Sequence, residues 1–393
     1  MDTAPSTSPR HEPVHVLYGG AHLFRRDTPD KLGRIARAAL DAHGTGAAIF
    51  PNEALRARVA AKLEARAVEA LCIDFEDGFG PRPDAEEDAE AVRAGAELGS
   101  AQSGTRIGLR IKALSGPTAA RGARTLETFL ASLAAAGPLP ESFSVTLPKV
   151  EETSSVGALE RLLARLEAEH GWPRGGIGIE LMIETPRALL DADGRVPIAR
   201  LVDAAAGRCT AVHLGAYDLT ASLGVPAPAQ RLDHPACDAA RLTMTTALAG
   251  RDVAVFDGAT TTLPLGTTRD VQAAWELHAR NVRRAVDFGI FQGWDLHPAQ
   301  LPARYAALFG YFEEHREAMA KRLANFIARA TQATRVGQEF DDAATGHGLL
   351  GFFRRGLACG AFDESDLETT TLTRTELASR SFAPIVSARS PAR

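Results

Sequence analysis

The sequence has little cysteine and no long apolar run. Its 393 residues include four cysteines, which are far apart and form no CxxC pair. A zinc ribbon or a disulfide framework is therefore not expected. No stretch approaches the roughly 20 apolar residues of a membrane span, and the polar N-terminus lacks the apolar core of a signal peptide. We expect a soluble, cytoplasmic protein that has no membrane partner.

The chain also lacks an excess of positive charge. Lysine and arginine number 44 against 49 aspartates and glutamates, which gives a formal net charge of −5. Such a chain offers little to neutralise phosphate groups, so nucleic acid is not expected as a partner. What is present is ordinary for a globular protein, with 45% hydrophobic and 24% charged residues. A sizeable folded core is therefore expected.

Short β-rich runs alternate with alanine-rich segments of helical periodicity over most of the chain. Eight strands separated by helices are typical of a parallel sheet closed into a (β/α)8 TIM barrel, and a doubly wound open sheet is the alternative. One helix is expected over 270–286, with Asp270 as its N-cap. The expected strands span 14–19, 69–74, 106–111, 143–147, 177–183, 210–214, 252–256 and 289–295.

These patterns divide the chain into four parts. Residues 1–12 and 381–393 are interpreted as flexible tails. The strand and helix alternation fills 13–300, which we predict to be a catalytic barrel. Residues 301–380 are expected to form a C-terminal extension that is mostly helical.

Charged residues fall on the strand faces that should line the barrel. Alternate side chains of a strand point to opposite faces, and barrel interiors are usually apolar. Buried charges must pair, hydrate or bind a metal, because an unpaired one is costly. They could form a structural ion-pair network, but several of them end strands, which favours an active site at the C-terminal mouth. The inward-facing charged residues are Asp74, Glu76, Arg110, Lys112, Glu180 and Glu184.

Six segments then occur in a recognisable order. They are IDFEDGFG (73–80), LRIKAL (109–114), LPKVEE (147–152), IELMIETPRALLDA (179–192), HLGAYDLTASLG (213–224) and WDLHPAQL (294–301). In order and spacing, the set resembles the citrate lyase β-subunit / malyl-CoA lyase family. That family is related to the metal-dependent hydroxy-ketoacid aldolases.

The resemblance implies a (β/α)8 barrel that binds Mg²⁺, or Mn²⁺ in its place, through Glu184 and Asp218. It also implies that Arg110 contacts substrate oxygens. Mg²⁺ prefers oxygen ligands and is usually held by one or two carboxylates plus water and substrate, which suits this pair. From the residues alone, Asp218 could instead cap the helix that begins near Leu219. The acidic residues that the resemblance places around Arg110, and that we expect to orient it, are Asp74, Glu76 and Asp77.

Further substrate contacts are expected at the barrel mouth. Gly19 and Gly20 permit close backbone approach after the first strand, and His22 lies in the same turn. Gly215 is expected to line the substrate site after the sixth strand.

Two lysines lie in the resembling segments. Lys112 replaces the small polar residue typical of the family. It is expected to point inward near Arg110, where it could bind a substrate carboxylate or phosphate, or act as a Schiff-base nucleophile. A plain salt bridge to Glu76 or Asp77 is the alternative. Lys149, in the LPK segment, is interpreted as structural.

The general acid/base is not identified by the sequence. Members of the resembled family carry an MVDxP-like segment that supplies an aspartate to a neighbouring subunit, and this chain lacks it. The nearest match is QEFDDAATGHGLL (338–350), which offers Asp341 or Asp342. Because family members assemble as homo-oligomers, commonly trimers or hexamers, a homo-oligomer is expected here.

Taken together, these features predict a Mg²⁺-dependent carbon–carbon lyase or aldolase. It would cleave a β-hydroxy acid or its CoA thioester through a metal-stabilised enolate, or run the reverse condensation. Its ligand would be an oxo or hydroxy acid, or an acyl-CoA. A Schiff-base aldolase using Lys112 and a non-catalytic ligand-binding barrel are the alternatives.

Overall fold

The computed structural model describes residues 13–101, 104–335 and 343–370, together with 372, 373, 376, 377 and 385. These residues form two compact units. One comprises Pro13–Pro51 and Ala60–Arg304, and the other comprises Asn52–Val59 and the described residues from Tyr305 onward. The predicted tails lie outside the described residues, apart from Ile385.

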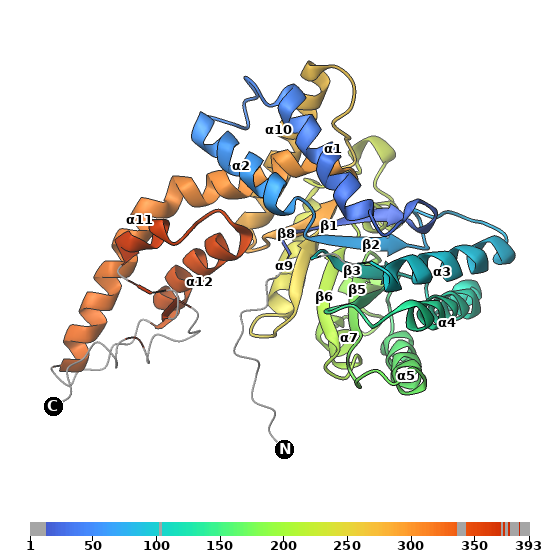
Figure 1. The fold of residues 1–393 in the computed structure, drawn as a ribbon. Helices are drawn as coiled ribbons and strands as arrows, with labels where there is room; N and C mark the ends of the chain where they lie inside the picture. The colour runs from blue at the N-terminus through green and yellow to red at the C-terminus, as the bar shows by residue number, and fades with distance from the viewer. Residues whose placement is uncertain are drawn as a thin grey trace. The chain divides into compact units, whose positions relative to one another are not determined.

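The first unit is built around a closed barrel of eight parallel strands (Figure 1). Consecutive strands pair with each other, and β8 closes the barrel on β1. All eight expected strands are confirmed, and so is the TIM barrel in place of an open sheet. The strands are β1 (His15–Gly20), β2 (Ala70–Asp74), β3 (Arg106–Arg110), β4 (Ser144–Leu147), β5 (Gly178–Ile183), β6 (Cys209–Leu214), β7 (Ala254–Asp257) and β8 (Gln292–Asp295).

Helices alternate with the strands and surround the barrel (Figure 1). The α-helices are α1 (Thr28–His43), α2 (Glu53–Arg66), α3 (Asp84–Gly99), α4 (Ala119–Ala136), α5 (Thr153–Glu169), α6 (Pro186–Leu189), α7 (Ile198–Asp203), α8 (Ala216–Ser222), α9 (Pro235–Ala247), α10 (Thr268–Asp287), α11 (Leu301–Arg335) and α12 (Ala343–Cys359). Short 3-10 helices are η1 (Ala21–Leu23), η2 (Gly116–Thr118), η3 (Ala227–Ala229), η4 (Pro298–Gln300) and η5 (Ser365–Thr370). Among the described helices, none is both long enough and apolar enough to cross a membrane.

The N-cap of helix α10 differs from the predicted one. Its N-cap is Thr267, whose hydroxyl accepts from the backbone N–H of Asp270. The Asp270 carboxylate accepts in return from the backbone N–H of Thr267, which completes a capping box. The prediction that Asp270 is the N-cap is therefore wrong, because a hydroxyl residue three positions earlier takes that role.

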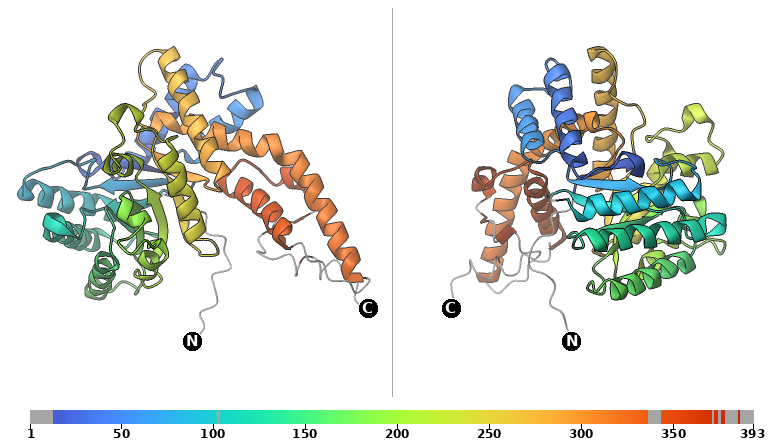
Figure 2. Two further views of the ribbon diagram at one scale, coloured as in Figure 1. Left: turned by 180° about the vertical axis from the view of Figure 1, so that it is seen from behind. Right: turned by 45° about the vertical axis from the view of Figure 1, so that its right-hand side comes forward.

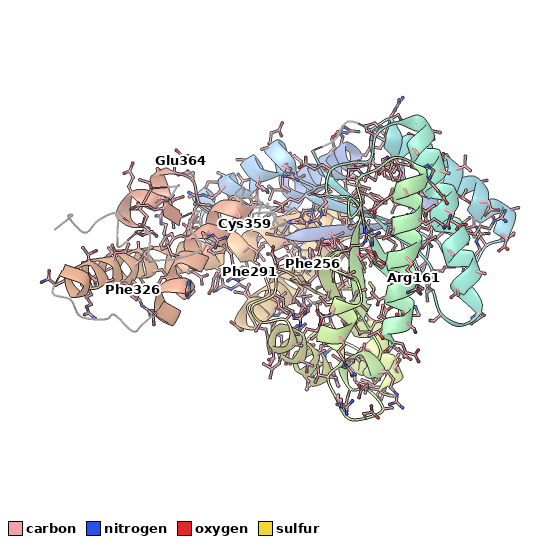
Figure 3. The ribbon with its side chains drawn as sticks, turned by 90° about the horizontal axis from the view of Figure 1, so that it is seen from below. Arg161, Phe256, Phe291, Phe326, Cys359 and Glu364 are labelled. Carbon is pink, nitrogen blue, oxygen red and sulfur yellow. The ribbon has the colours of Figure 1, made fainter. Side chains whose placement is uncertain are left out.

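Alternate strand residues fill the barrel interior, as the two-residue period of a strand requires. Cys72, Met182, Phe256 and Trp294 belong to one buried apolar cluster there. Phe256 lies among the strands in the side-chain view (Figure 3). Because all strands are parallel, their C-terminal ends share one mouth, and the polar residues discussed below lie at that end.

The second unit contains most of α11 together with α12, which lie side by side (Figure 2). Their contact is aromatic, with the rings of Phe312 and Phe352 centred 5.1 Å apart. Arg58, from the first part of α2, forms an ion pair of 3.0 Å with the buried Asp366. The segment Asn52–Val59 thus belongs to this unit, although it falls inside the 13–300 range expected from sequence order.

Candidate active site at the barrel mouth

Four charged residues mark the C-terminal mouth of the barrel. Asp74 ends β2 and Arg110 ends β3, and the two residues are register partners in the sheet. Glu184 directly follows β5, and Asp218 lies in the first turn of α8, just after β6. Asp218 does not cap that helix, whose N-cap residue is Gly215. The sheet therefore brings together residues that are far apart in sequence.

Arg110 is held rigidly by a carboxylate. Its Nε and Nη2 donate to the two oxygens of Asp74 at 2.7 and 2.5 Å, and both side chains are buried. Asp74 also accepts from the backbone N–H groups of Glu76 and Gly78 at 2.8 and 2.7 Å. Nη1 of Arg110 lies 3.1 Å from Glu76 and 3.7 Å from Asp77. Asp74 thus orients the guanidinium and shapes the loop after β2, as expected for a positioning residue.

Aromatic rings and a buried histidine lie beside Arg110. The guanidinium carbon is 5.0 Å from the ring centre of Tyr18, which stacks on Trp294. Trp294 Nε1 donates to Nδ1 of His213 at 2.8 Å, and Nε2 of His213 lies 3.0 Å from a carboxylate oxygen of Glu180. These rings were not singled out from the sequence, because aromatic residues inside a barrel have the pattern of an ordinary core.

Glu180 is a structural carboxylate rather than part of the mouth. It accepts from Ser144 at 2.8 Å and Thr146 at 3.2 Å as well as from His213. Burial raises the pKa of Glu180, but the hydrogen bonds and charges around it outweigh burial and lower this pKa to about 2. The interior charge noted in the sequence therefore divides between a paired network inside the barrel and a cluster at its mouth.

Glu184 has the most perturbed carboxyl of the mouth. It is buried, and its Oε1 accepts from the backbone N–H of Lys149 at 2.6 Å. Burial raises its pKa to about 8, and the charges of Asp218 and Glu76 act in the same direction. Gly215 lies so close that a Cβ there would be 2.3 Å from the Cβ of Glu184. The site therefore holds a carboxyl group whose ionised form is disfavoured by burial and by the neighbouring carboxylates.

Lys149 is a functional candidate that the sequence analysis interpreted as structural. It lies two residues past β4 with a φ of 52°, a conformation that non-glycine residues rarely adopt. Its ammonium forms an ion pair with Glu76 and lies 3.8 Å from Asp218. Burial alone would lower the pKa of Lys149, but the hydrogen bond to Glu76 and the charge of Glu184 raise it. The one sequence feature that could have indicated a functional role for Lys149 is its position just after the end of a strand.

A cavity of about 630 Å³ opens beside these groups. It extends from Glu184 and Asp218 along the loop between β4 and α5. Nine of its twelve lining residues carry a carboxylate or a hydroxyl group, and its one cationic side chain among the described residues is Lys149. The lining residues are Leu114, Ser115, Lys149, Glu151, Glu152, Ser154, Ser155, Ala158, Glu184, Thr185, Asp218 and Ser222.

The donor set at the mouth suits a hard divalent cation. Glu184 and Asp218 offer only oxygen atoms, which Mg²⁺ and Mn²⁺ accept as ligands. A bound cation would also favour ionisation of Glu184, whose pKa is raised by burial. Across the described part of the chain, no three His, Cys, Asp or Glu side chains are already grouped as metal ligands. The protein therefore provides two carboxylates, with the Lys149 ammonium lying 3.8 Å from the second.

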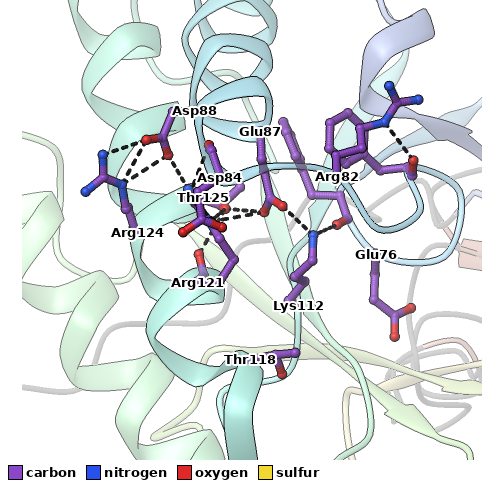
Figure 4. Close-up of polar contacts among 12 residues, drawn as sticks. Glu76, Arg82, Asp84, Glu87, Asp88, Lys112, Thr118, Arg121, Arg124 and Thr125 are labelled. Atoms are coloured by element: carbon purple, nitrogen blue, oxygen red, sulfur yellow. Dashed lines mark hydrogen bonds and ion pairs between the residues drawn. The ribbon is translucent and has the colours of Figure 1, made fainter.

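Lys112 does not lie in this cluster. Its ammonium donates to Glu87 of α3 at 2.6 Å and to the carbonyl of Phe75 at 2.8 Å. Figure 4 shows Lys112 directed at Glu87 within a network that includes Thr125 of α4, while Glu76 stands apart. The prediction that Lys112 points inward near Arg110 is wrong, because β3 ends at Arg110 and strand alternation no longer applies two residues later.

The first loop lies against the loop after β2. A Cβ on Gly20 would be 2.2 Å from the carbonyl oxygen of Gly78, so only glycine fits there. The ring of His22 packs near Phe79 at 5.8 Å, and burial lowers the pKa of His22. Gly19 has open space where a side chain would be. Contact of these three residues with substrate stays a prediction. The two acid/base candidates from the sequence, Asp341 and Asp342, lie outside the described residues.

Comparisons with known proteins give a family and a fold. Residues 2–385 match the family described as "Domain of unknown function (DUF6986)". No curated protein matches the chain. Many solved structures are similar, and they include structures of malate synthase from Haloferax volcanii.

The lead(II) complex of that malate synthase is 17% identical, with a TM-score of 0.52 over 76% of this chain and 74% of its own. The native enzyme at 3 mM glyoxylate is 15% identical, with a TM-score of 0.50 over 87% and 98%. A citrate lyase β subunit from M. tuberculosis, complexed with oxaloacetate and magnesium, is 20% identical, with a TM-score of 0.45 over 75% and 96%. At these identities the malate synthases support the barrel fold alone.

Proposed function

The chain belongs to the DUF6986 family, and from its barrel mouth we propose that it is a divalent-cation-dependent carbon–carbon lyase or aldolase. The observation that carries the proposal is the pair of carboxylates on one cavity wall, beside a charge cluster that ends at a buried arginine. Glu184 and Asp218 line one cavity, and the rigidly held Arg110 pairs with Glu76 at the edge of the same charge cluster. The six sequence segments that resemble the citrate lyase β-subunit family contain these residues.

Each residue has a role that follows from its contacts. Glu184 and Asp218 would hold Mg²⁺ or Mn²⁺, which when bound supplies a Lewis acid for the substrate carbonyl and its enolate. Arg110 carries five N–H donors, of which Asp74 takes two, and its Nη1 faces Glu76 at 3.1 Å, so a substrate carboxylate would reach Arg110 by taking the place of Glu76. Asp74 and Glu76 keep the guanidinium fixed, which lowers the reorganisation needed during reaction.

The cavity favours a small oxo or hydroxy acid over a CoA thioester. Four carboxylates line it, from Glu151, Glu152, Glu184 and Asp218, against the single ammonium of Lys149. The diphosphate and phosphate groups of CoA would meet like charge along this wall. A short acid can place its carboxylate and carbonyl at a cation held by Glu184 and Asp218 and leave its neutral end among the hydroxyls. We therefore propose cleavage of a hydroxy-keto acid whose hydroxyl lies β to its ketone, which gives a pyruvate enolate and a second carbonyl compound, or the reverse condensation.

A Schiff-base mechanism through Lys112 receives no support from its contacts. The amine is held as an ion pair with the buried Glu87, outside the residues that line the cavity. A Schiff-base lysine instead needs a neutral amine that can reach a substrate carbonyl.

Proton exchange in deuterated water tests the proposal without knowledge of the second substrate. Pyruvate and acetyl-CoA are incubated separately with the protein, with and without Mg²⁺, and their methyl signals are followed by ¹H NMR. We expect Mg²⁺-dependent loss of the pyruvate methyl signal with the wild type and no loss with Glu184→Gln. Glu141→Gln, a matched change at an exposed turn, should exchange the methyl protons as fast as the wild type. Exchange of acetyl-CoA alone would overturn the small-acid assignment. Absence of exchange from both would overturn the enolate assignment and favour a ligand-binding barrel.

A further inference from the structure

Lys149 occupies an unusual place in the carboxylate cluster. Its backbone N–H binds the carboxylate of Glu184, while its side chain reaches Glu76 and lies 3.8 Å from Asp218. The left-handed backbone at φ 52° permits both contacts from one residue. Such a conformation persists only where the surroundings enforce it, and it is often found at functional sites.

The ammonium lies close to one of the oxygens that a divalent cation would take. Glu184 and Asp218 line the same cavity as Lys149. A cation held by these two carboxylates would therefore compete with the Lys149 ammonium for their negative charge. Two positive centres cannot use the same carboxylate oxygens without strong repulsion. Lysine has a flexible four-carbon stem, and this side chain is 42% exposed, so it has a route away from the carboxylates.

We propose that Lys149 is an internal counter-ion that competes with the divalent cation for this carboxylate cluster and is displaced when the cation binds. The proposal rests on the proposed function, since it takes Glu184 and Asp218 as the cation ligands. In the metal-free protein, the ammonium offsets the charges of Glu76 and Asp218, the two carboxylates that it faces. In the loaded protein, it turns toward the cavity, where it adds positive charge beside the substrate.

If Lys149 competes with the cation, removing its positive charge should increase the affinity for the metal. Mn²⁺ affinity is measured by isothermal titration calorimetry for the wild type, Lys149→Met, Lys149→Gln and Lys149→Arg. The two neutral variants should bind Mn²⁺ about tenfold more tightly, the order expected for loss of one unit charge at ion-pair distance. Lys149→Arg should bind no more tightly than the wild type. Lys31→Met, which removes a charge from an exposed pair on α1, should leave the affinity unchanged.

Thermal melting gives a second readout that does not depend on activity. Without metal, both neutral variants should melt below the wild type, because the carboxylates lose their counter-charge. Saturating Mn²⁺ should raise their melting temperature by more than it raises that of the wild type. Equal or weaker Mn²⁺ binding by the neutral variants would overturn the role of Lys149 while leaving the cation site intact. Absence of Mn²⁺ binding from wild type and variants alike would instead overturn the proposed function as well.

Discussion

Gly215 controls the position of Glu184, and its replacement by alanine is a sharp test of the site geometry. Its φ of −88° suits alanine, so the substitution acts through space rather than through backbone strain. The new Cβ would lie 2.3 Å from the Cβ of Glu184 and 2.7 Å from its Oε2. Because carbon atoms pack at about 3.5–4.0 Å, one group must move by roughly 1 Å. Overpacking of this kind costs about 1–3 kcal/mol of folding free energy.

The same displacement should weaken the cation site. Residues that orient metal ligands typically contribute about 10- to 100-fold in metal affinity, so we expect a loss of that order for Mn²⁺. Urea denaturation measures the stability of Gly215→Ala, and calorimetric titration measures its Mn²⁺ affinity. Gly348→Ala is the matched control, because Gly348 is exposed within α12 and has open space around it. That change should raise stability by about 0.5–1 kcal/mol and leave Mn²⁺ binding unaltered. Wild-type stability and affinity in Gly215→Ala would refute the reasoning.

Three further predictions concern buried charge. Asp74→Asn should lower the free energy of unfolding by about 3–5 kcal/mol, because it leaves the buried Arg110 without its paired carboxylate; a loss below about 1 kcal/mol in urea denaturation would contradict this. Glu184 should contribute a loss of stability to the metal-free protein as pH rises from about 4.5 to about 8, because burial raises its pKa from 4.5 to about 8 and the folded chain then binds more protons than the unfolded chain. The free energy of unfolding of the wild type should therefore fall relative to that of Glu184→Gln in denaturation curves measured across that range, and a constant difference between the two would argue against the assignment. Lys112→Met should destabilise the protein but leave Mn²⁺ affinity unchanged, and borohydride with pyruvate should trap no adduct at this lysine; a reduced adduct found by mass spectrometry would restore the Schiff-base mechanism.

The fold could be predicted from local sequence signals because the barrel strands lie in short β-rich runs that alternate with helical segments. The pairing of Asp74 with Arg110 could also be predicted from the sequence, since both residues end strands that are consecutive in a parallel sheet. The strand period failed at Lys112 because β3 had already ended, and the side chain found its partner on α3. Periodicity places a side chain only while the regular element lasts.

Other features depend on contacts that a linear pattern does not encode. The role of Lys149 arises from a left-handed backbone after β4, and nothing in LPKVEE specifies that conformation. The segment Asn52–Val59 belongs with the C-terminal unit, where Leu55 lies beside Gly310, although it is surrounded in sequence by barrel residues. Long-range packing of this kind is decided by surface complementarity, which single-sequence reasoning does not resolve.

The most direct test of the central claim is an anomalous-scattering measurement on crystals grown with Mn²⁺ and pyruvate. We expect one strong Mn²⁺ peak per chain, coordinated by Glu184 and Asp218 and by two oxygens of pyruvate, with the pyruvate carboxylate also near Arg110. Absence of a peak between these two carboxylates, or a peak held by other residues, would contradict the proposed cation site.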